Sequence, residues 1–383
     1  MTHIIHFHNG SGGGVLSVIR NLIRFSQNPQ IKNYVIFTLN EKMPQDFVVP
    51  KIFGAEDIKI FRYSSRWNFY HTCRQLAKLL PDEKAVLVAH DWLELGMASN
   101  LGLQNPVVQF LHGDYDYYYE LAEKHAEAID EFICVSPVIA RKLILRLPDR
   151  KDDIHNCRFP VPEVQNDKKF ISEKTRILFC VRDLNDESKQ FNLLPKVHEV
   201  LSANNCKIRW TIIGGGKSGD EIKTLLGSDA KYFSSLNNQH VLEEMKQNDI
   251  LMHPSLIEGF PVVVVEAMKA GLVPLITDWA GSTKDLVVEG ETGFYLTPKD
   301  ALGYAEKIRV LNGNRNLLAH LSENAKRKAE QLFNPYHNTQ IIEGVYCEAL
   351  KKEREKLPKR VYGSRLDKRW IPNWVVERMR RKK

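Results

Sequence analysis

The fold is decided by the stretch Pro254-Ser-Leu-Ile-Glu258-Gly-Phe-Pro261-Val-Val-Val-Val-Glu266-Ala-Met-Lys-Ala-Gly271. Apolar runs at 250–252 and 273–276 flank it and have the character of short buried strands. Two parallel strands in one sheet need a crossover of about a dozen residues or more, usually helical. We therefore predict a helix over Pro261–Ala270 that begins at a proline and stops at Gly271.

Glu258 and Glu266 stand eight residues apart around this helix start. A helix N-terminus offers free backbone N–H groups and a partial positive charge, which suits a phosphate. A carboxylate beside such a site can accept hydrogen bonds from the hydroxyls of a ribose or another sugar. The spacing alone also fits, and by itself favours, an ordinary helix with one solvated and one capping glutamate.

The stretch resembles the E-x7-E signature of the retaining glycosyltransferases of family 4, and Gly281-Ser282 and Gly290-Glu-Thr-Gly293 resemble its continuation. The resemblance implies that Glu258 contacts the transferred sugar and that Glu266 contacts the ribose of the donor. It also implies donor contacts from the backbone of Gly259, Phe260, Pro261 and Val262. The implied fold is α/β of the GT-B type, with two Rossmann-like domains facing across a cleft and a C-terminal helix crossing back to the first domain.

Arg182 and Lys189 follow an apolar run at 176–181. The family has Gly-Arg-Leu and then Lys-Gly at this point, and these two cations clamp the donor pyrophosphate. Here Val181 replaces the first glycine, Gln190 replaces the second, and the Arg-to-Lys spacing is two residues longer. The resemblance implies the clamp role for both cations, whereas the residues alone favour two solvated surface cations.

A second anion-binding pattern opens the chain. The apolar run Ile4–Phe7 leads into Asn9-Gly-Ser-Gly-Gly-Gly14, and apolar residues at helical spacing follow it. Gly12, Gly13 and Gly14 lack side chains, so a phosphate can approach their backbone N–H groups, and we expect them to contribute to donor binding. A simple tight turn also fits. The loop is not a Walker motif, because no Lys-Ser or Lys-Thr follows the glycines.

Several polar and aromatic residues follow the other strands predicted in the first half. The resemblance places His112 near the donor sugar and the reacting centre, and we expect His90 to be structural or on the acceptor side. Tyr115 and Tyr117 are predicted to bind the acceptor, because aromatic faces stack on sugar rings. The alternative, that these tyrosines are partly buried and pack helices against one another, is about as well supported. Asp114-Tyr115-Asp116 spells a D-x-D motif, but one three-residue match arises easily by chance and we expect no metal.

The alternation of strands and helices predicts parallel α/β sheets. We expect an N-terminal Rossmann-like acceptor-side domain over 1–165 and a nucleotide-sugar-binding domain over 166–333. A crossover helix over 334–357 and a basic, aromatic tail over 358–383 complete the chain. The charged and proline-containing stretch 151–175 is predicted to be the interdomain linker.

The distribution of charge and of cysteines indicates the binding partner of the tail and the cellular compartment of the protein. The whole chain carries a net charge of +7, whereas residues 358–383 hold ten Lys or Arg against two acids, so the rest is close to neutral. A charge confined to a tail that also contains Trp370 and Trp374 favours an anionic membrane surface over nucleic acid. A disordered tail, or one whose tryptophans pack on the first domain, fits as well. The six scattered cysteines, and the lack of a signal peptide or a long apolar run, predict a cytoplasmic protein peripheral to the inner face of the membrane.

The expected function is retaining, metal-independent transfer of a sugar from a nucleotide-diphosphate sugar, with no further cofactor. The acceptor would be a hydroxyl of a glycan or lipid-linked glycan in bacterial surface polysaccharide or lipopolysaccharide synthesis. Two alternatives remain open, a sugar-nucleotide epimerase-like GT-B enzyme and a non-catalytic GT-B binding subunit. An NAD-dependent enzyme fits least well, because the glycine spacing does not match. The sequence does not distinguish UDP from GDP, or one sugar or acceptor from another.

Overall fold

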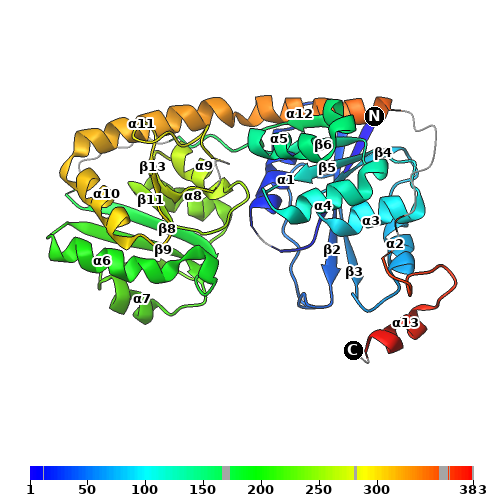
Figure 1. Cartoon of the computed structure of the whole chain (residues 1–383), viewed down its shortest axis with the longest axis horizontal. Helices are drawn as coiled ribbons and strands as arrows, with labels where there is room; N and C mark the ends of the chain where they lie inside the picture. Colours follow the sequence, from blue (N-terminus) through cyan, green and yellow to red (C-terminus); the bar gives the residue numbers. More distant parts are fainter. Residues whose placement is uncertain (12, 166–172, 280–282, 353–360, 362, 382–383) are drawn as a thin grey trace. The chain divides into compact units, whose positions relative to one another are not determined.

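A computed structural model describes residues 1–11, 13–165, 173–279, 283–352, 361 and 363–381 (Figure 1). The chain divides into two compact units. Unit 1 comprises Met1–Pro160 and Pro335–Lys383, and unit 2 comprises Val161–Asn334.

Unit 1 is built on a parallel sheet of seven strands in the order β3-β2-β1-β4-β5-β6-β7. Its strands are β1 (Thr2–His8), β2 (Ile31–Asn40), β3 (Asp57–Tyr63), β4 (Ala85–Ala89), β5 (Val107–Leu111), β6 (Glu131–Cys134) and β7 (Ile154–Asn156). Its α-helices are α1 (Gly14–Phe25), α2 (Phe69–Ala77), α3 (Trp92–Leu101), α4 (Asp116–His125), α5 (Pro137–Arg146), α12 (Pro335–Lys351) and α13 (Asn373–Arg380).

Unit 2 has a parallel sheet of six strands in the order β10-β9-β8-β11-β12-β13. Its strands are β8 (Thr175–Asp183), β9 (Ile208–Gly215), β10 (Lys231–Phe233), β11 (Ile250–His253), β12 (Val273–Thr277) and β13 (Phe294–Leu296). Its α-helices are α6 (Leu194–Ala203), α7 (Gly219–Leu226), α8 (Asn238–Lys246), α9 (Val262–Lys269), α10 (Ala301–Gly313) and α11 (Arg315–Leu332).

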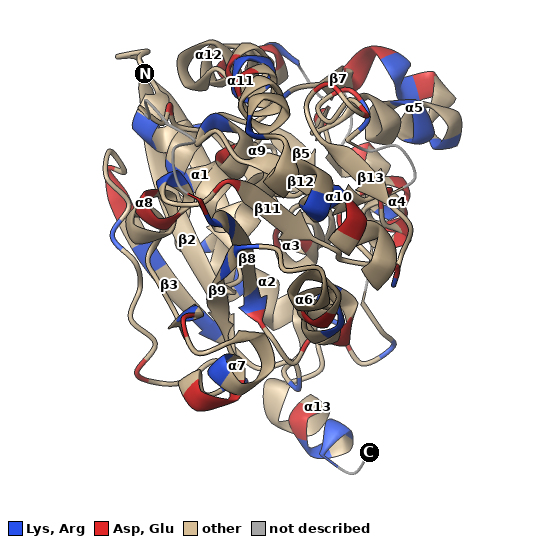
Figure 2. Cartoon of the chain, turned by 90° about the vertical axis from the view of Figure 1, so that its left-hand side faces the viewer, with Lys and Arg blue, Asp and Glu red and all other residues tan. Residues whose placement is uncertain are grey.

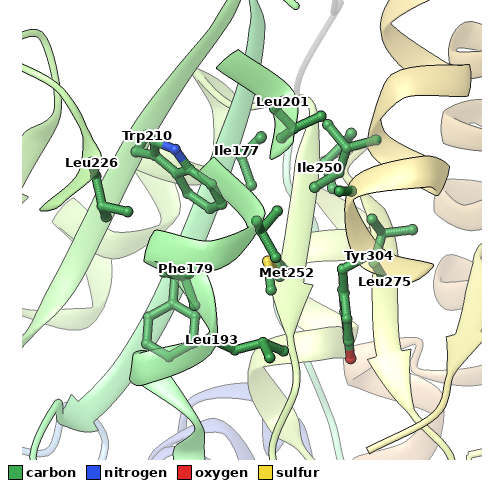
Figure 3. Close-up of a cluster of buried hydrophobic side chains, with 14 of the residues drawn as sticks. Ile177, Phe179, Leu193, Leu201, Trp210, Leu226, Ile250, Met252, Leu275 and Tyr304 are labelled. Carbon is green, nitrogen blue, oxygen red and sulfur yellow. The ribbon is translucent and has the colours of Figure 1, made fainter. Parts of the chain in front are cut away.

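The central strands are buried along their whole length. Every residue of β4, β5 and β12 is buried, as expected for parallel strands covered on both faces. The core of unit 2 shows the same arrangement (Figure 3): Phe179 of β8 and Trp210 of β9 lie among Leu201 of α6, Leu226 of α7 and neighbouring apolar side chains. Each unit therefore has a hydrophobic core of its own.

The predicted crossover helix is α9, one residue shorter at each end than predicted. Pro261 stands immediately before it, and Gly271 ends it with a φ of 77°, a conformation that favours glycine. Val264 and Val265 are fully buried against the rest of unit 2. Burial thus overrides the weak helix propensity of the valines.

The helix predicted over 334–357 is α12, which ends at Lys351; residues 353–360 lie outside the described part of the chain. It belongs to unit 1 and packs on α1, β4, β5 and β6. The Ser26 hydroxyl donates to Glu343 Oε1 of α12, and the rings of Phe25 and Tyr336 meet edge to face at 5.2 Å. The C-terminal segment contains a short helix, α13, which begins immediately after Pro372.

The linker prediction was wrong at its start. Residues 148–153 form 3-10 turns with a kink at Arg150, and Ile154–Asn156 form β7, which pairs with β6 at the edge of the first sheet. A strand of three residues is too short to show an alternating pattern, so its charged surroundings concealed it. The strands β3, β10 and β13 were missed as well, and each of them is half-exposed or short.

All six cysteines are free thiols. Among the described residues, the helices are too short or too polar for any of them to cross a bilayer.

Candidate active site

The strand order reverses once in each unit. The chain of unit 1 proceeds from β1 to β2 and β3 and then returns to β4 on the other side of β1; unit 2 does the same with β8, β9, β10 and β11. Open parallel sheets bind ligands at the carboxyl ends of the strands at such a switch point. The predicted site residues follow these strands in both units.

At the switch point of unit 2, the structure brings together two residues that were predicted separately. Lys189 Nζ lies 2.7 Å from Glu258 Oε1, and His253 Nε2 lies 3.0 Å from the same oxygen. Lys189 ends a short turn after β8, and His253 ends β11. The Leu256 N–H donates to the Ser188 carbonyl at 2.8 Å, which ties the two loops together.

Glu258 is held in its ionised form. Burial alone would raise the pKa of this carboxyl, but the hydrogen bond and charge interaction of His253, together with the Lys189 ammonium, lower it to about 2. The carboxylate is 16% exposed, so it remains reachable from solvent. His253 was not among the predicted site residues, although a polar side chain at the end of a buried strand was a usable signal.

Glu266 has a different environment on α9. It is buried, and Asn238 Nδ2 of α8 donates to its Oε1 at 3.0 Å. Burial raises the pKa of this carboxyl to about 7, and the Asn238 hydrogen bond offsets only part of that shift. Gly259 and Phe260 lie before the helix, Val262 begins it, and no side chain caps its first turn.

Arg182 lies near the carboxyl end of β8 with its side chain exposed. Within the part of the chain that the structure describes, its guanidinium forms no hydrogen bond or ion pair. The turn after β9 lies beside the loop that follows β8. A Cβ placed on Gly216 in this turn would come within 2.4 Å of Asn185 Nδ2 in that loop. With a φ of 94°, Gly216 is needed for both space and conformation.

In unit 1, the glycine loop follows β1 at the other switch point. Gly12 lies outside the described residues, Gly13 has a φ of 117°, and Gly14 begins α1. No side chain caps the N-terminus of α1. Asn9 Nδ2 donates to Asp91 Oδ2 at 2.8 Å, which ties the start of the loop to the end of β4.

Three histidine rings form a hydrogen-bonded chain across β1, β4 and β5. His6 Nδ1 lies 3.3 Å from His90 Nε2, and His90 Nδ1 lies 2.7 Å from His112 Nε2. His90 is thus buried in the middle with both ring nitrogens occupied, and one of its two partners is the predicted site residue His112. His6 has no counterpart among the predicted site residues; strand order alone makes it a neighbour of His90.

The three rings are uncharged at neutral pH. Burial lowers the pKa of His6 to about 4 and that of His112 to about 3. The pKa of His90 falls well below its ordinary value, first through burial and then through its histidine neighbours. Because a neutral ring has one donor and one acceptor nitrogen, the tautomer of each ring depends on its neighbour.

Asp91 and Glu94 form a capping box at the start of α3. Glu94 accepts hydrogen bonds from the backbone N–H groups of His90 and Asp91 at 2.7 and 2.6 Å. The Tyr117 hydroxyl donates to Asp91, which holds this predicted acceptor-binding ring in place. The D-x-x-E spacing was a readable signal for the cap.

The other predicted acceptor residue, Tyr115, stands immediately before α4 and stacks on Tyr118 at 6.4 Å. The two acids of the D-x-D triplet are engaged in ion pairs. Asp114 lies 2.5 Å from Lys142 Nζ, and Asp116 lies 2.6 Å from Arg146 Nη2.

Among the described residues, the side chains of Glu131, His155 and Glu348 have the spacing of metal ligands. The Lys352 ammonium lies 2.5 Å from Glu131 Oε1 and from Asp153 Oδ1. The Lys352 ammonium therefore already supplies a cation to this cluster. Because Lys352 follows α12 and Glu131 lies in β6, the pair also attaches the end of α12 to the sheet.

Two family sequence models match consecutive parts of the chain. "Glycosyltransferase Family 4" matches residues 12–156, and "Glycosyl transferases group 1" matches residues 162–328. These matches cover both units and both switch points. The chain belongs to the family 4 glycosyltransferases.

Named relatives match parts of this family 4 chain. Sulfoquinovosyl transferase SQD2 of Arabidopsis thaliana is 27% identical over 172 residues, which are 44% of this chain and 33% of that protein. The N,N'-diacetylbacillosaminyl-diphospho-undecaprenol alpha-1,3-N-acetylgalactosaminyltransferase of Campylobacter jejuni is 28% identical over 127 residues, 33% of each chain. The matched regions thus span about a third of these relatives' length.

Solved structures share the fold over nearly the whole chain. HepE of Anabaena, crystallised with UDP and glucose, superposes with a TM-score of 0.71 at 16% identity. The superposition covers 91% of this chain and 100% of that one. At this identity the likeness shows the GT-B fold, which confirms the predicted fold class.

Proposed function

We propose that this family 4 protein is a retaining, metal-independent glycosyltransferase that uses a nucleotide-diphosphate sugar and glycosylates a hydroxyl of a glycan or lipid-linked glycan. The observation that carries the proposal is the switch point of unit 2, where Lys189 pairs with Glu258 in the loops after β8 and β11, while Arg182 lies near the carboxyl end of β8 and Glu266 lies on α9, the helix that follows β11. Two cations can bind the diphosphate of a nucleotide sugar. Two carboxylates can accept hydrogen bonds from the hydroxyls of its ribose and of its transferred sugar.

The donor half of the reaction is assigned to unit 2. Arg182 and Lys189 bind the diphosphate, and the uncapped start of α9 adds backbone donors for the same anion. The ionised Glu258 accepts hydrogen bonds from hydroxyls of the transferred sugar. Glu266 accepts them from the ribose. A nucleotide sugar with either uracil or guanine satisfies these contacts.

The acceptor half is assigned to unit 1, where Tyr115 and Tyr117 flank the end of β5. His112 presents an uncharged imidazole to the reacting centre, oriented through His90. The phosphates also meet the glycines of the first loop, as the family resemblance implies.

The chemical step breaks the bond between the anomeric carbon and the diphosphate oxygen. The acceptor oxygen forms its bond to the same face of that carbon. Its proton passes to the departing diphosphate oxygen, so no enzyme nucleophile is needed. Cations preorganised around the leaving group contribute most at this point, with roughly 3 kcal/mol for each such contact.

The Glu258→Gln variant tests the proposal. Gln keeps the shape of the side chain but loses the charge, so we expect turnover to fall by at least about 100-fold while free UDP or GDP binds with nearly unchanged affinity. Product formation and nucleotide binding are measured on the same preparation. Unchanged turnover contradicts the assignment of Glu258, and release of free nucleotide with no glycosylated product by the native protein supports the epimerase-like alternative.

The acceptor is proposed to reside at an anionic membrane surface. One relative is named for a diphospho-undecaprenol acceptor, and the C-terminal segment of this chain, residues 361 and 363–381, has the chemistry of a surface anchor. Trp370 and Trp374 are 76% and 67% exposed, and Figure 2 shows basic residues on α13. A tryptophan beside cations suits the headgroup region of a bilayer. Cytoplasmic, peripheral location on the inner face follows from this proposal.

A further inference from the structure

A cavity of about 210 Å³ lies inside unit 1, beneath the C-terminal segment. Its lining includes large apolar side chains from the end of β3 and the loop after it, from α2, α3 and α4, and from the segment itself: Tyr63, Trp67, Phe69, Trp92, Leu121 and Val361. The rings of Phe69 and Trp92 stack at 5.4 Å, and Tyr63 meets Trp92 edge to face at 6.4 Å. Neither the family motifs nor the donor site uses this cavity.

The cover of the cavity is built with specific contacts. Asp367, which is 2% exposed, accepts from the Phe69 N–H at 2.7 Å and from Arg380 Nη2 with both oxygens at 2.9 Å. Asn68 Nδ2 donates to the carbonyls of Lys368 and Ile371 at 2.9 and 2.6 Å. The buried Asp367 carboxylate and the Arg380 guanidinium that pairs with it hold the C-terminal segment in one position on unit 1.

Several polar side chains of the lining are already engaged. Arg380 is neutralised by Asp367, the Thr72 hydroxyl donates to the Asn68 carbonyl at 3.1 Å, and Ser65 is paired with Glu41. His125 Nδ1 lies 2.8 Å from Ser99 Oγ, and burial lowers the pKa of this histidine to about 4, so it is neutral. A sugar ring needs free hydrogen-bond partners all round it, whereas a hydrocarbon chain does not.

One cation stands free at the rim. Lys124 of α4 lines the cavity mouth with an exposed side chain, and it has no hydrogen bond or ion pair with any other residue that the structure describes. An ammonium beside an apolar cavity fits a ligand with an anionic head and an apolar chain.

We propose that this cavity binds the hydrocarbon chain of a lipid phosphate, with its phosphate at Lys124. An apolar cavity of about 150 Å³ suffices for benzene, so this cavity accepts the head-proximal part of a chain. The C-terminal segment that covers the cavity also presents Trp370 and Trp374 to solvent. With these tryptophans at a membrane surface, a hydrocarbon chain would pass from the membrane into the cavity beneath the same segment. Identifying this lipid phosphate as the carrier of the acceptor rests on the proposed function, whereas its binding does not.

The test uses the quenching of tryptophan fluorescence by a brominated decyl phosphate, kept below its micellar concentration and without donor sugar. In a Trp370→Phe/Trp374→Phe background, we expect saturable quenching that disappears when Trp67 and Trp92 are also replaced by Phe. Leu121→Phe, which fills the cavity, should weaken binding about tenfold. Lys124→Gln should weaken it about fivefold while leaving the binding of brominated decanol unchanged.

The outcomes separate the two proposals. Quenching that survives the loss of Trp67 and Trp92, or displacement of the probe by a lipid-free oligosaccharide, overturns the assignment of a hydrocarbon chain. A protein that transfers sugar but shows no quenching retains the proposed function and loses this site. Saturable quenching in a protein without transfer activity retains the site and removes the proposed function.

Discussion

Glu266 is buried in the free protein, and burial opposes the negative charge that its proposed role as an acceptor for the ribose hydroxyls uses. Its carboxyl is buried with Asn238 as its polar partner, and its pKa is raised to about 7. The ordinary pKa of a glutamate is about 4.3, so the folded state binds the proton more tightly than the unfolded state. The corresponding stabilisation is complete below pH 4.5 and is lost as the pH rises through 7.

We therefore expect Glu266→Gln to raise the melting temperature of unit 2 by roughly 5 °C at pH 8 and by much less at pH 6. The same change removes a charged acceptor for ribose hydroxyls and should weaken nucleotide binding about tenfold. Calorimetry and a binding titration at both pH values measure the two effects. A variant that is equally stabilised at both pH values contradicts the proposed cause.

His90 is expected to act by orienting His112. His90→Ala leaves His112 Nε2 without its partner and frees the ring to change tautomer and angle. Turnover should then fall by up to about 100-fold, because small displacements of a reacting group are costly. Nucleotide binding to unit 2 should be unchanged. Nitrogen NMR of the histidine rings should show a changed tautomer at His112, and a lower turnover with an unchanged tautomer contradicts the positioning role.

At the scale of elements, the C-terminal segment has two faces with different chemistry. Asp367, Arg380 and the fully buried Val376 face the protein. Trp370, Trp374 and the half-exposed Met379 face solvent. The tryptophans therefore do not serve to attach the segment to unit 1, and their replacement should leave the fold intact.

We expect Trp370→Ser/Trp374→Ser to reduce co-sedimentation with anionic vesicles at least fivefold without lowering the melting temperature. Each Lys or Arg near an anionic surface contributes about 1 kcal/mol, so binding should also weaken as salt rises. Asp367→Asn is the matched variant on the inner face, since it should loosen the segment and lower thermal stability. Equal sedimentation of native protein and the double variant contradicts the anchor.

At the scale of the whole molecule, the two units differ in how they respond to acid. In unit 1 burial lowers the pKa of five histidines, which are His6, His8, His90, His112 and His125. Their stabilising effect is present above the unfolded pKa of about 6.5 and is lost as the pH falls toward their folded values. The raised pKa of Glu94 opposes this effect in unit 1, and in unit 2 the lowered pKa of His198 and the raised pKa of Glu266 act in opposite directions.

Unit 1 should therefore lose stability first when the pH falls from 7.5 to 5.5. Each pH unit below the unfolded pKa removes up to about 1.4 kcal/mol of stability for each buried histidine, and the five histidines together outweigh the opposing carboxyl of Glu94. Differential scanning calorimetry of the full chain should show the transition of unit 1 moving down by several degrees, with that of unit 2 nearly constant. Parallel movement of both transitions, or none in unit 1, contradicts this assignment of acid sensitivity.

The sequence by itself determined the fold class and much of the donor site. Alternating apolar runs and helical patterns predict parallel sheets, because burial on both faces leaves a local signature in each strand. The Pro261-to-Gly271 stretch predicted α9 to within one residue at each end. The family signature singled out Glu258 and Glu266, which do follow the switch point of unit 2, while their roles stay predictions.

Only the tertiary structure decided which of these side chains meet. The Lys189–Glu258 pair, the histidine chain and the docking of Asp367 on Phe69 join residues 69, 84 and 298 positions apart. Lys269 of α9 is fully buried and donates to the carbonyls of Val161 and Phe333 at 2.7 and 2.9 Å. Strand order and chain crossings create these contacts, and local periodicity carries no information about either, because it reports only which face of an element is buried.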